Sequence, residues 1–375
     1  MAGIYLHIPF CKQACYYCDF HFSTNSSYTD AMVAAMAKEL KLQQHYLSEA
    51  EVNTIYFGGG TPSLLSKDQI TLLLNEIYQH YPIGADPEIT LEANPDDLSR
   101  DKLTQLKACG INRLSIGVQS FDDVQLAFMN RAHTAKEALQ SINDARTLGF
   151  DNITIDLIYG IPNSSLNDWA SNLAQAVALK VPHISAYCLT IEPGTVFGHR
   201  QQKKQLTPLQ EDVTAEQFEL LVKTLDENGY DHYEVSNFCL PGMHSRHNSN
   251  YWKFQKYLGV GPSAHSFDLS TRQFNIKNNH LYISKIDQDI IPCQVESLTD
   301  KDKANEYLLT SLRTSWGCDL HFLKDRFNID LLKSQSEKLN DYLEKKLIVK
   351  SNNVIFLTTH GRLVADKIIE DFFIL

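Results

Sequence analysis

Residues 3–200 alternate short apolar runs with longer segments in which apolar residues recur at helical spacing. Six of the apolar runs have the length and composition of buried strands, and a predicted helix follows each of them. These runs are Ile4–Ile8, Thr54–Phe57, Glu88–Glu92, Arg113–Val118, Ile153–Ile158 and His183–Leu189. A series of about six strand–helix units favours a parallel sheet. We therefore expect an α/β fold, a partial parallel (β/α)6 barrel.

Several predicted helices carry start and stop signals. Ser66 stands three residues before Gln69, and Thr134 stands three before Glu137, which is the spacing of a capping box at a helix start. Glycine suits the left-handed residue that ends a helix before the next strand. Helices are expected to end in this way at Gly110, Gly149 and Gly229.

The C-terminal part of the chain has a different order of elements. Residues 298–375 read as helices, then a hairpin at 347–357, then a last helix, an order that resembles a winged helix. From Asp300 onward basic and acidic residues are equal in number, which argues against a DNA-binding role. We expect this segment to cover the open side of the barrel or to meet a partner protein. The predicted units are the partial barrel at 1–230, a connecting segment at 231–297 and this winged-helix-like domain at 298–375.

Composition and charge narrow the class of protein. Hydrophobic residues make up 43% and charged residues 21%, and 34 Lys plus Arg against 45 Asp plus Glu give a net charge of −11. That charge argues against a general nucleic-acid-binding surface. No apolar run approaches the roughly 18 residues of a membrane-spanning helix, and we expect no secretory signal. Five cysteines are scattered singly along the chain, which does not suggest a disulfide framework: Cys109, Cys188, Cys239, Cys293 and Cys318. We therefore expect a reducing, cytoplasmic location.

Three further cysteines stand close together on a loop that leaves the first predicted strand. Cys11, Cys15 and Cys18 have C-x3-C-x2-C spacing, and thiolates held in this way suit an iron–sulfur cluster or zinc. With three sulfurs, a four-iron cluster would keep one iron free for a small molecule. Zinc would need a fourth ligand such as His7 or His21, and the chain has no second pair of closely spaced cysteines. A cluster is the favoured interpretation and zinc is the alternative.

Polar residues and glycines recur where the predicted strands end. Residues 58–62, Gly-Gly-Gly-Thr-Pro, follow the second strand, Glu92 closes the third, Gln119 follows the fourth, and Asp156 lies in the fifth. Parallel βα architectures bind ligands beyond the carboxyl ends of their strands. Three glycines let a backbone approach a ligand and present its carbonyls, which suits an amino group better than a phosphate. We expect these residues to form one binding site.

The combined motifs resemble those of the radical S-adenosylmethionine (SAM) proteins, and among them the oxygen-independent coproporphyrinogen III oxidase group. The resemblance covers nearly the whole chain and rests on the cysteine motif after Tyr-Leu-His-Ile-Pro-Phe, on Tyr-Phe-Gly-Gly-Gly-Thr-Pro, on Gly-Val-Gln-Ser-Phe and on Asp-Leu-Ile-Tyr-Gly-Ile-Pro. It implies that Cys11, Cys15 and Cys18 hold a [4Fe–4S] cluster whose fourth iron binds SAM. The SAM site would then comprise Tyr5, Tyr17, Gly58, Gly59, Gly60, Thr61, Glu92, Gln119, Arg131 and Asp156.

Two features separate the chain from the oxidase of that group. Phe20 takes a position where the oxidase has another cysteine, and only ten residues precede Cys11, where the oxidase has a long extension. Residues 247–252, His-Asn-Ser-Asn-Tyr-Trp, match the His-Asn-x-x-Tyr-Trp signature of the heme chaperones of the HemW type. This resemblance implies that His247 binds heme, since imidazole is a common axial ligand. The alternative is a hydrogen-bonded structural histidine. His232, His244 and His265 belong to the same region.

The expected function is therefore that of a heme chaperone with a [4Fe–4S] cluster and SAM. The resemblance implies a heme-accepting partner, for which a membrane-associated respiratory protein is one candidate, and it is compatible with a homodimer. One alternative is a radical SAM oxidase that decarboxylates porphyrinogen propionates. A zinc-stabilised interaction protein would explain the cysteines but not the strand-end residues.

Overall fold

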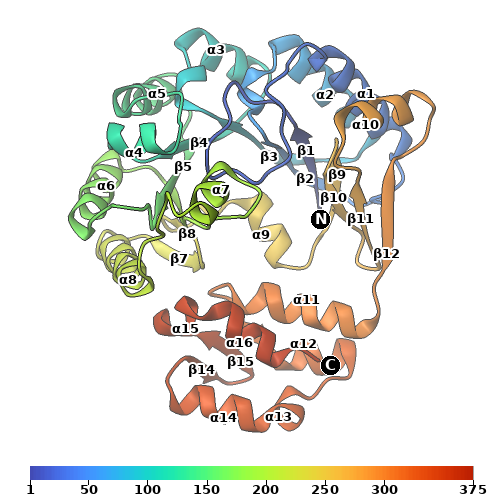
Figure 1. Cartoon of the computed structure of the whole chain (residues 1–375). Helices are drawn as coiled ribbons and strands as arrows, with labels where there is room; N and C mark the ends of the chain where they lie inside the picture. Colours follow the sequence, from blue (N-terminus) through green and yellow to red (C-terminus); the bar gives the residue numbers. More distant parts are fainter. Residues whose placement is uncertain (375) are drawn as a thin grey trace.

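A single large sheet forms the body of the molecule (Figure 1). The structure, a computed structural model, describes residues 1–374. Six strands run parallel in the order of the sequence, as predicted. They are β1 (Ala2–Ile8), β2 (Val52–Gly59), β3 (Ile83–Ala93), β4 (Arg113–Gln119), β5 (Asn152–Tyr159) and β6 (His183–Cys188). The prediction of a partial parallel barrel in an α/β fold is confirmed.

Short strands extend the same sheet at both edges. Next to β1 lies a parallel strand followed by three antiparallel ones: β9 (Lys256–Val260), β10 (His265–Phe267), β11 (Thr271–Asn275) and β12 (Cys293–Ser297). At the other edge β6 pairs with antiparallel β8 (Asn237–Cys239), and β8 pairs with β7 (Asp231–Glu234). Residues 231–297 therefore add strands to the sheet and do not merely connect two domains.

Helices cover the outer face of the parallel strands (Figure 1). Side chains alternate along each strand, so that in β1 Ile4, Leu6 and Ile8 are buried in the main hydrophobic core, while Tyr5 packs on Tyr56 across the other face. The covering helices are α1 (Thr29–Leu42), α2 (Lys67–His80), α3 (Arg100–Ala108), α4 (Asp123–Phe128), α5 (Ala135–Thr147), α6 (Leu166–Leu179) and α8 (Glu211–Glu227). Short helices fill the connections: η1 (Pro62–Leu64), η2 (Pro95–Asp97), α7 (Val196–Gln202), α9 (Arg246–Trp252) and α10 (Asn279–Asp287).

The predicted helix signals are confirmed. The Ser66 side chain accepts from the backbone N–H of Gln69, Thr134 does the same for Glu137, and both sites form complete capping boxes. The three helix-ending glycines all have positive φ, as the left-handed stop requires: Gly110, Gly149 and Gly229.

The C-terminal residues form a separate unit with its own core, which lies below the sheet in Figure 1. It contains α11 (Asp300–Leu312), α12 (Leu320–Phe327), α13 (Leu331–Ser334), α14 (Ser336–Glu344), α15 (Thr359–Leu363) and α16 (Ala365–Phe372). A small antiparallel sheet joins β13 (Cys318–Asp319), β15 (Val354–Leu357) and β14 (Ile348–Ser351). The predicted order of helices, hairpin and last helix is confirmed. Among the described residues, none of the helices is long and apolar enough to span a membrane.

Candidate functional site

A cavity of about 500 Å³ opens at the carboxyl ends of the parallel strands. Its wall combines the loop after β1 with the ends of β2 to β6, so it brings together residues that are far apart in the sequence. Most of the predicted site residues line it: Cys11, Cys15, Cys18, Tyr17, Gly59, Gly60, Thr61, Glu92, Gln119, Arg131 and Asp156. Tyr5, Gly58 and His247 do not line it. Residues that the strand-end rule groups together therefore line one cavity.

Backbone hydrogen bonds fix the loop that carries the three cysteines. The N–H of Cys11 donates to the carbonyl of Ser23 (3.0 Å), and that of Tyr16 donates to Met129 (3.1 Å). The N–H of Phe197, the second residue of α7, donates to the carbonyl of Tyr16 (2.9 Å). The loop is thus held between the segment after α4 and α7, and it presents its thiols to the cavity.

The donor set suits a metal cluster better than a disulfide. All three cysteines are free and partly exposed, and burial raises the pKa of Cys11 to about 11, so a bound cluster would have to displace its proton. As placed, no three His, Cys, Asp or Glu side chains among the described residues stand close enough to hold a metal ion. The thiols would therefore have to turn toward one centre within the cavity that they share. Residues and cavity together fit a three-thiolate cluster.

Arg131 brings a fixed cation to the same wall. Its guanidinium donates to Asn94 Oδ1 (2.6 Å) and to the carbonyl of Gly117 (2.8 Å). It also lies 3.2 Å from the Cys15 sulfur and 3.4 Å from the Tyr17 hydroxyl. A guanidinium whose two terminal nitrogens are held in this way can stabilise a thiolate and pair with a ligand carboxylate.

Two carboxyl groups lie in the floor of the cavity. Glu92 accepts from the hydroxyl of Tyr56 (2.8 Å) through Oε1 and from the N–H of Gly59 (3.1 Å) through Oε2. The pKa of Glu92 is raised to about 7, mainly by burial and in part by repulsion from Asp156, and burial raises the pKa of Asp156 to about 6. Such carboxyl groups can bind hydroxyls in either protonation state, and they would bind a cationic ligand when ionised.

The glycines at the end of β2 have a role that the sequence did not reveal. A Cβ atom at Gly58 would lie 2.9 Å from both Tyr5 and Tyr56. Gly59 has a φ of +105°, and a Cβ there would lie 2.6 Å from the His7 ring. A Cβ at Gly60 would lie 2.6 Å from the Phe10 carbonyl. The close approach that demands glycine is thus to the protein's own residues, although Gly59 and Gly60 also line the cavity.

Sequence reasoning missed part of the cavity wall. It did not single out Asn94, Ser115, Gly117, Ile158, Tyr187, Cys188, Leu189, Thr190 and Glu192. The signal was available for the residues from 187 to 190, because they end or directly follow the sixth strand and the same strand-end rule applies to them. Ser115 and Gly117 share the alternation that places Gln119 on this face.

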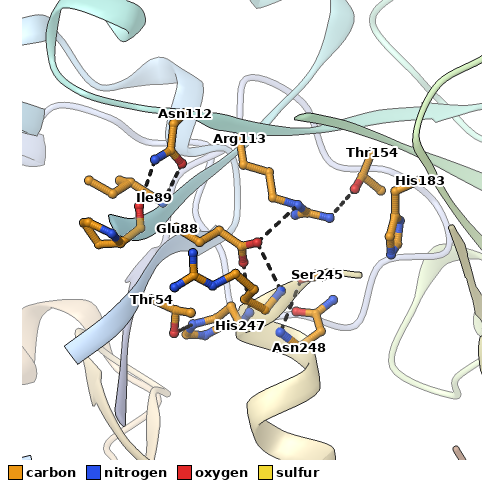
Figure 2. Close-up of polar contacts among 12 residues, drawn as sticks. Thr54, Glu88, Ile89, Asn112, Arg113, Thr154, His183, Ser245, His247 and Asn248 are labelled. Carbon is orange, nitrogen blue, oxygen red and sulfur yellow. Dashed lines mark hydrogen bonds and ion pairs between the residues drawn. The ribbon is translucent and has the colours of Figure 1, made fainter. Parts of the chain in front are cut away.

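His247 lies elsewhere, in α9 at the opposite end of the strands. Its side chain is 2% exposed. Its ring nitrogens lie 2.9 Å from Thr54 Oγ1 and 3.0 Å from the Tyr251 hydroxyl, and Figure 2 shows the ring among the residues of this buried network. An axial ligand needs a free ring nitrogen that the iron can reach. The residues present do not fit heme at His247, and the structure favours the alternative of a hydrogen-bonded histidine.

The neighbouring histidines are dispersed. His232 lies in β7, where Nε2 is 3.1 Å from the carbonyl of Val235. His265 begins β10. His244 precedes α9 and is partly exposed beside the rings of Tyr233 (4.6 Å between centroids) and Trp316 (6.0 Å).

Comparisons with known proteins cover nearly the whole chain. The sequence model of the Radical SAM superfamily matches residues 5–175, and that of the HemN C-terminal domain matches residues 298–364. A protein of Bacillus subtilis named heme chaperone HemW is 34% identical over 375 residues, which is 99% of each chain. The Escherichia coli protein of the same name is 40% identical over 265 residues, 70% of this chain and 69% of that one.

A solved structure shares the fold. The coproporphyrinogen III oxidase HemN of Escherichia coli, described as a radical SAM enzyme, matches 99% of this chain and 90% of its own with a TM-score of 0.86 and 24% identity. At that identity the likeness establishes the common architecture of sheet and C-terminal unit.

Proposed function

The chain belongs to the HemW family of radical SAM proteins, and from this premise we propose that it binds heme and transfers it to an acceptor protein. The observation that carries the proposal is its 34% identity, over 99% of both chains, with a relative named as a heme chaperone. The radical SAM fold further implies a [4Fe–4S] cluster and SAM.

Cys11, Cys15 and Cys18 are the proposed cluster ligands. They supply three thiolates from one anchored loop at one cavity. A cluster bound there would offer SAM an iron without a protein ligand. Arg131, 3.2 Å from the Cys15 sulfur, holds positive charge beside the thiolates and offsets part of their repulsion.

The rest of the cavity wall is the proposed SAM site. Glu92 and Asp156 supply oxygens for ribose hydroxyls or for the ligand's positive charge, and Arg131 can pair with its carboxylate. Tyr17 provides an aromatic surface, and Gly59 to Thr61 bring backbone groups to the ligand's amino end. The observation that supports this site is that all of these residues line one cavity.

We place the heme site outside α9, because both ring nitrogens of His247 are already hydrogen-bonded. The acceptor is a protein that takes up heme, and a membrane-associated respiratory protein remains one candidate. Eight free cysteines and a thiolate-bound cluster both suit the reducing cytoplasm. A homodimer is compatible with this proposal.

An oxidase acting on porphyrinogen propionates is the second candidate. The observation in its favour is the cavity lined by the proposed cluster and SAM residues, since heme carriage by itself does not require one. Phe20, in place of a cysteine of the oxidase pattern, weighs against it.

The test of heme binding uses anaerobically purified protein with its cluster reconstituted. Heme is titrated in, with and without SAM, and followed by its absorption spectrum. A saturable shift of the heme band at about one heme per chain is expected, and it should persist in Cys11→Ala, which loses the cluster. Absence of saturable heme binding in the wild type refutes the chaperone proposal.

A further inference from the structure

The position of α9, at the end of the strands opposite the cavity, suggests another role for the His-Asn-x-x-Tyr-Trp segment. We infer that His247 is a positioning residue for the SAM cavity: its ring supports Tyr56, which in turn holds the Glu92 carboxylate in the cavity floor. This inference rests on the proposed SAM site and assigns the histidine to that site instead of to heme iron.

A buried carboxylate from β3 anchors the start of α9. Glu88 accepts from the backbone N–H of His247 (2.9 Å) and of Arg246 (3.1 Å), and its Oε2 lies 3.9 Å from Arg113 Nε. Ser245 adds a cap by accepting from the N–H of Asn248 (3.3 Å). Figure 2 shows these groups converging beneath the strands. The first turn of α9 is thereby fixed to β3 and β4.

The ring of His247 fills a slot over β1 and β2. Its nitrogens lie within hydrogen-bonding distance of Thr54 on β2 and of Tyr251 in the next turn of α9. A Cβ atom at Gly3 would lie 3.2 Å from the ring and 2.7 Å from Thr54 Oγ1. The ring is buried and both of its nitrogens have partners, so it offers no free nitrogen to a porphyrin iron.

An aromatic stack connects this slot to the cavity floor. The His247 ring stacks on Tyr56 with centroids 4.9 Å apart and an angle of 26°, and Tyr56 stacks on Tyr5 at 6.0 Å and 29°. The Tyr56 hydroxyl donates to Glu92 Oε1 (2.8 Å). Glu92 also accepts from the N–H of Gly59, a residue of the cavity wall. His247 thus touches the group that aims Glu92, without touching the cavity itself.

Loss of the His247 imidazole should change the position and the pKa of Glu92. An alanine would remove the stacking partner of Tyr56 and leave the Thr54 and Tyr251 hydroxyls without the ring nitrogens as partners, so that Tyr56 could move away from Glu92. The hydrogen bond from Tyr56 lowers the pKa of Glu92 against the larger effect of burial. Without that bond the carboxyl group would be protonated to a greater extent at neutral pH, which disfavours a cationic ligand.

The test compares four variants with the wild type. His247→Ala removes the ring, and His247→Gln keeps a polar group that can reach Tyr251 but gives no iron-binding nitrogen. Tyr56→Phe removes only the bond to Glu92. His244→Ala is the matched control, because His244 lies in the same segment but contacts Tyr233 and Trp316.

Three readouts are measured: SAM affinity of the cluster-loaded protein, amide exchange of residues 58–61, and the heme absorption spectrum. His247→Ala and Tyr56→Phe should weaken SAM about tenfold or more and speed exchange at Gly59. His247→Gln should recover part of both and keep the wild-type heme spectrum, and His244→Ala should leave SAM affinity and exchange at Gly59 unchanged.

The outcomes separate the two proposals. If His247→Gln and His247→Ala lose the wild-type heme spectrum while SAM affinity and Gly59 exchange stay unchanged, His247 is an iron ligand and the inference is wrong. If the wild type binds no heme but the variants weaken SAM as described, the inference stands and the chaperone proposal falls. Exchange at Gly59 needs neither ligand, so unchanged exchange in Tyr56→Phe and both His247 variants also overturns the inference. Should His247→Ala not fold, Tyr56→Phe and His247→Gln retain the test.

Discussion

Truncation of Glu88 should destabilise the protein far more than truncation of its neighbour Asp86. Both residues belong to β3 and both contact Arg246, but their surroundings differ. Glu88 is 4% exposed and accepts from two backbone N–H groups of α9 beside the buried Arg113. Asp86 pairs with the Arg246 side chain at 3.3 Å, with its own side chain 94% exposed.

The magnitudes follow from burial. Glu88→Ala leaves the Arg113 guanidinium buried without its carboxylate, and removal of one partner of a buried pair costs about 3–5 kcal/mol. Asp86→Ala removes an exposed pair, for which about 0–1 kcal/mol is typical. Since a folded domain is stable by about 5–15 kcal/mol, the first change should remove a large part of that stability and the second very little.

The assay is urea unfolding of the ligand-free protein, followed by circular dichroism and by tryptophan fluorescence, to which Trp252 of α9 contributes. Glu88→Ala should lower the midpoint strongly and Asp86→Ala only slightly. If the free energy of unfolding falls by less than about 1 kcal/mol in both variants, Glu88 does not anchor α9, and the network of Figure 2 does not stabilise the fold.

Three further predictions concern the cavity. Changing any one of its three cysteines to alanine should abolish the binding of about four irons per chain, measured by iron analysis after reconstitution, whereas Cys109→Ala should not; full loading in all three variants would contradict the cluster assignment. Gly59→Val should destabilise the fold in thermal unfolding, because φ is +105° and the new side chain would meet the His7 ring; loss of SAM binding with unchanged stability would show that the valine acts in the cavity alone. Burial raises the pKa of Glu92 from 4.5 to about 7, so between these pH values the folded protein keeps a proton that the unfolded chain has released, and stability should fall as the pH rises from about 4.5 to 7. In unfolding experiments across this range, Glu92→Gln should show a weaker dependence of stability on pH. An equally steep dependence in the variant would assign the effect to another group.

The cavity was predictable because its signals are local. The end of a strand is visible in a short apolar run, and the parallel arrangement brings such ends to one edge. That rule predicts a shared site for Glu92, Gln119 and Asp156, and the structure brings all three to one cavity. The sixth strand obeys the same rule, so Tyr187 could have been found as well.

The surroundings of His247 were not predictable, because they come from distant parts of the chain. Its partner Thr54 is 193 residues away, and the Glu88 that binds its backbone is 159 residues away. A motif shows which residues stand together in sequence but not which face of a helix is buried. The strands β7 to β12 were not predicted for a related reason, since they are short and their pairing depends on strands already in place.

Heme transfer is the most direct test of the proposed function. Heme-loaded protein, with its cluster and SAM in place, is mixed anaerobically with a heme-free acceptor such as an apo-globin, and the absorption spectrum of the acceptor is followed. Coproporphyrinogen with SAM and a reductant is supplied in a parallel sample, and released carbon dioxide is measured. The acceptor should gain heme faster than from free heme in solution, and no carbon dioxide should appear. Carbon dioxide release together with failure to load the acceptor would contradict the chaperone function and identify an oxidase.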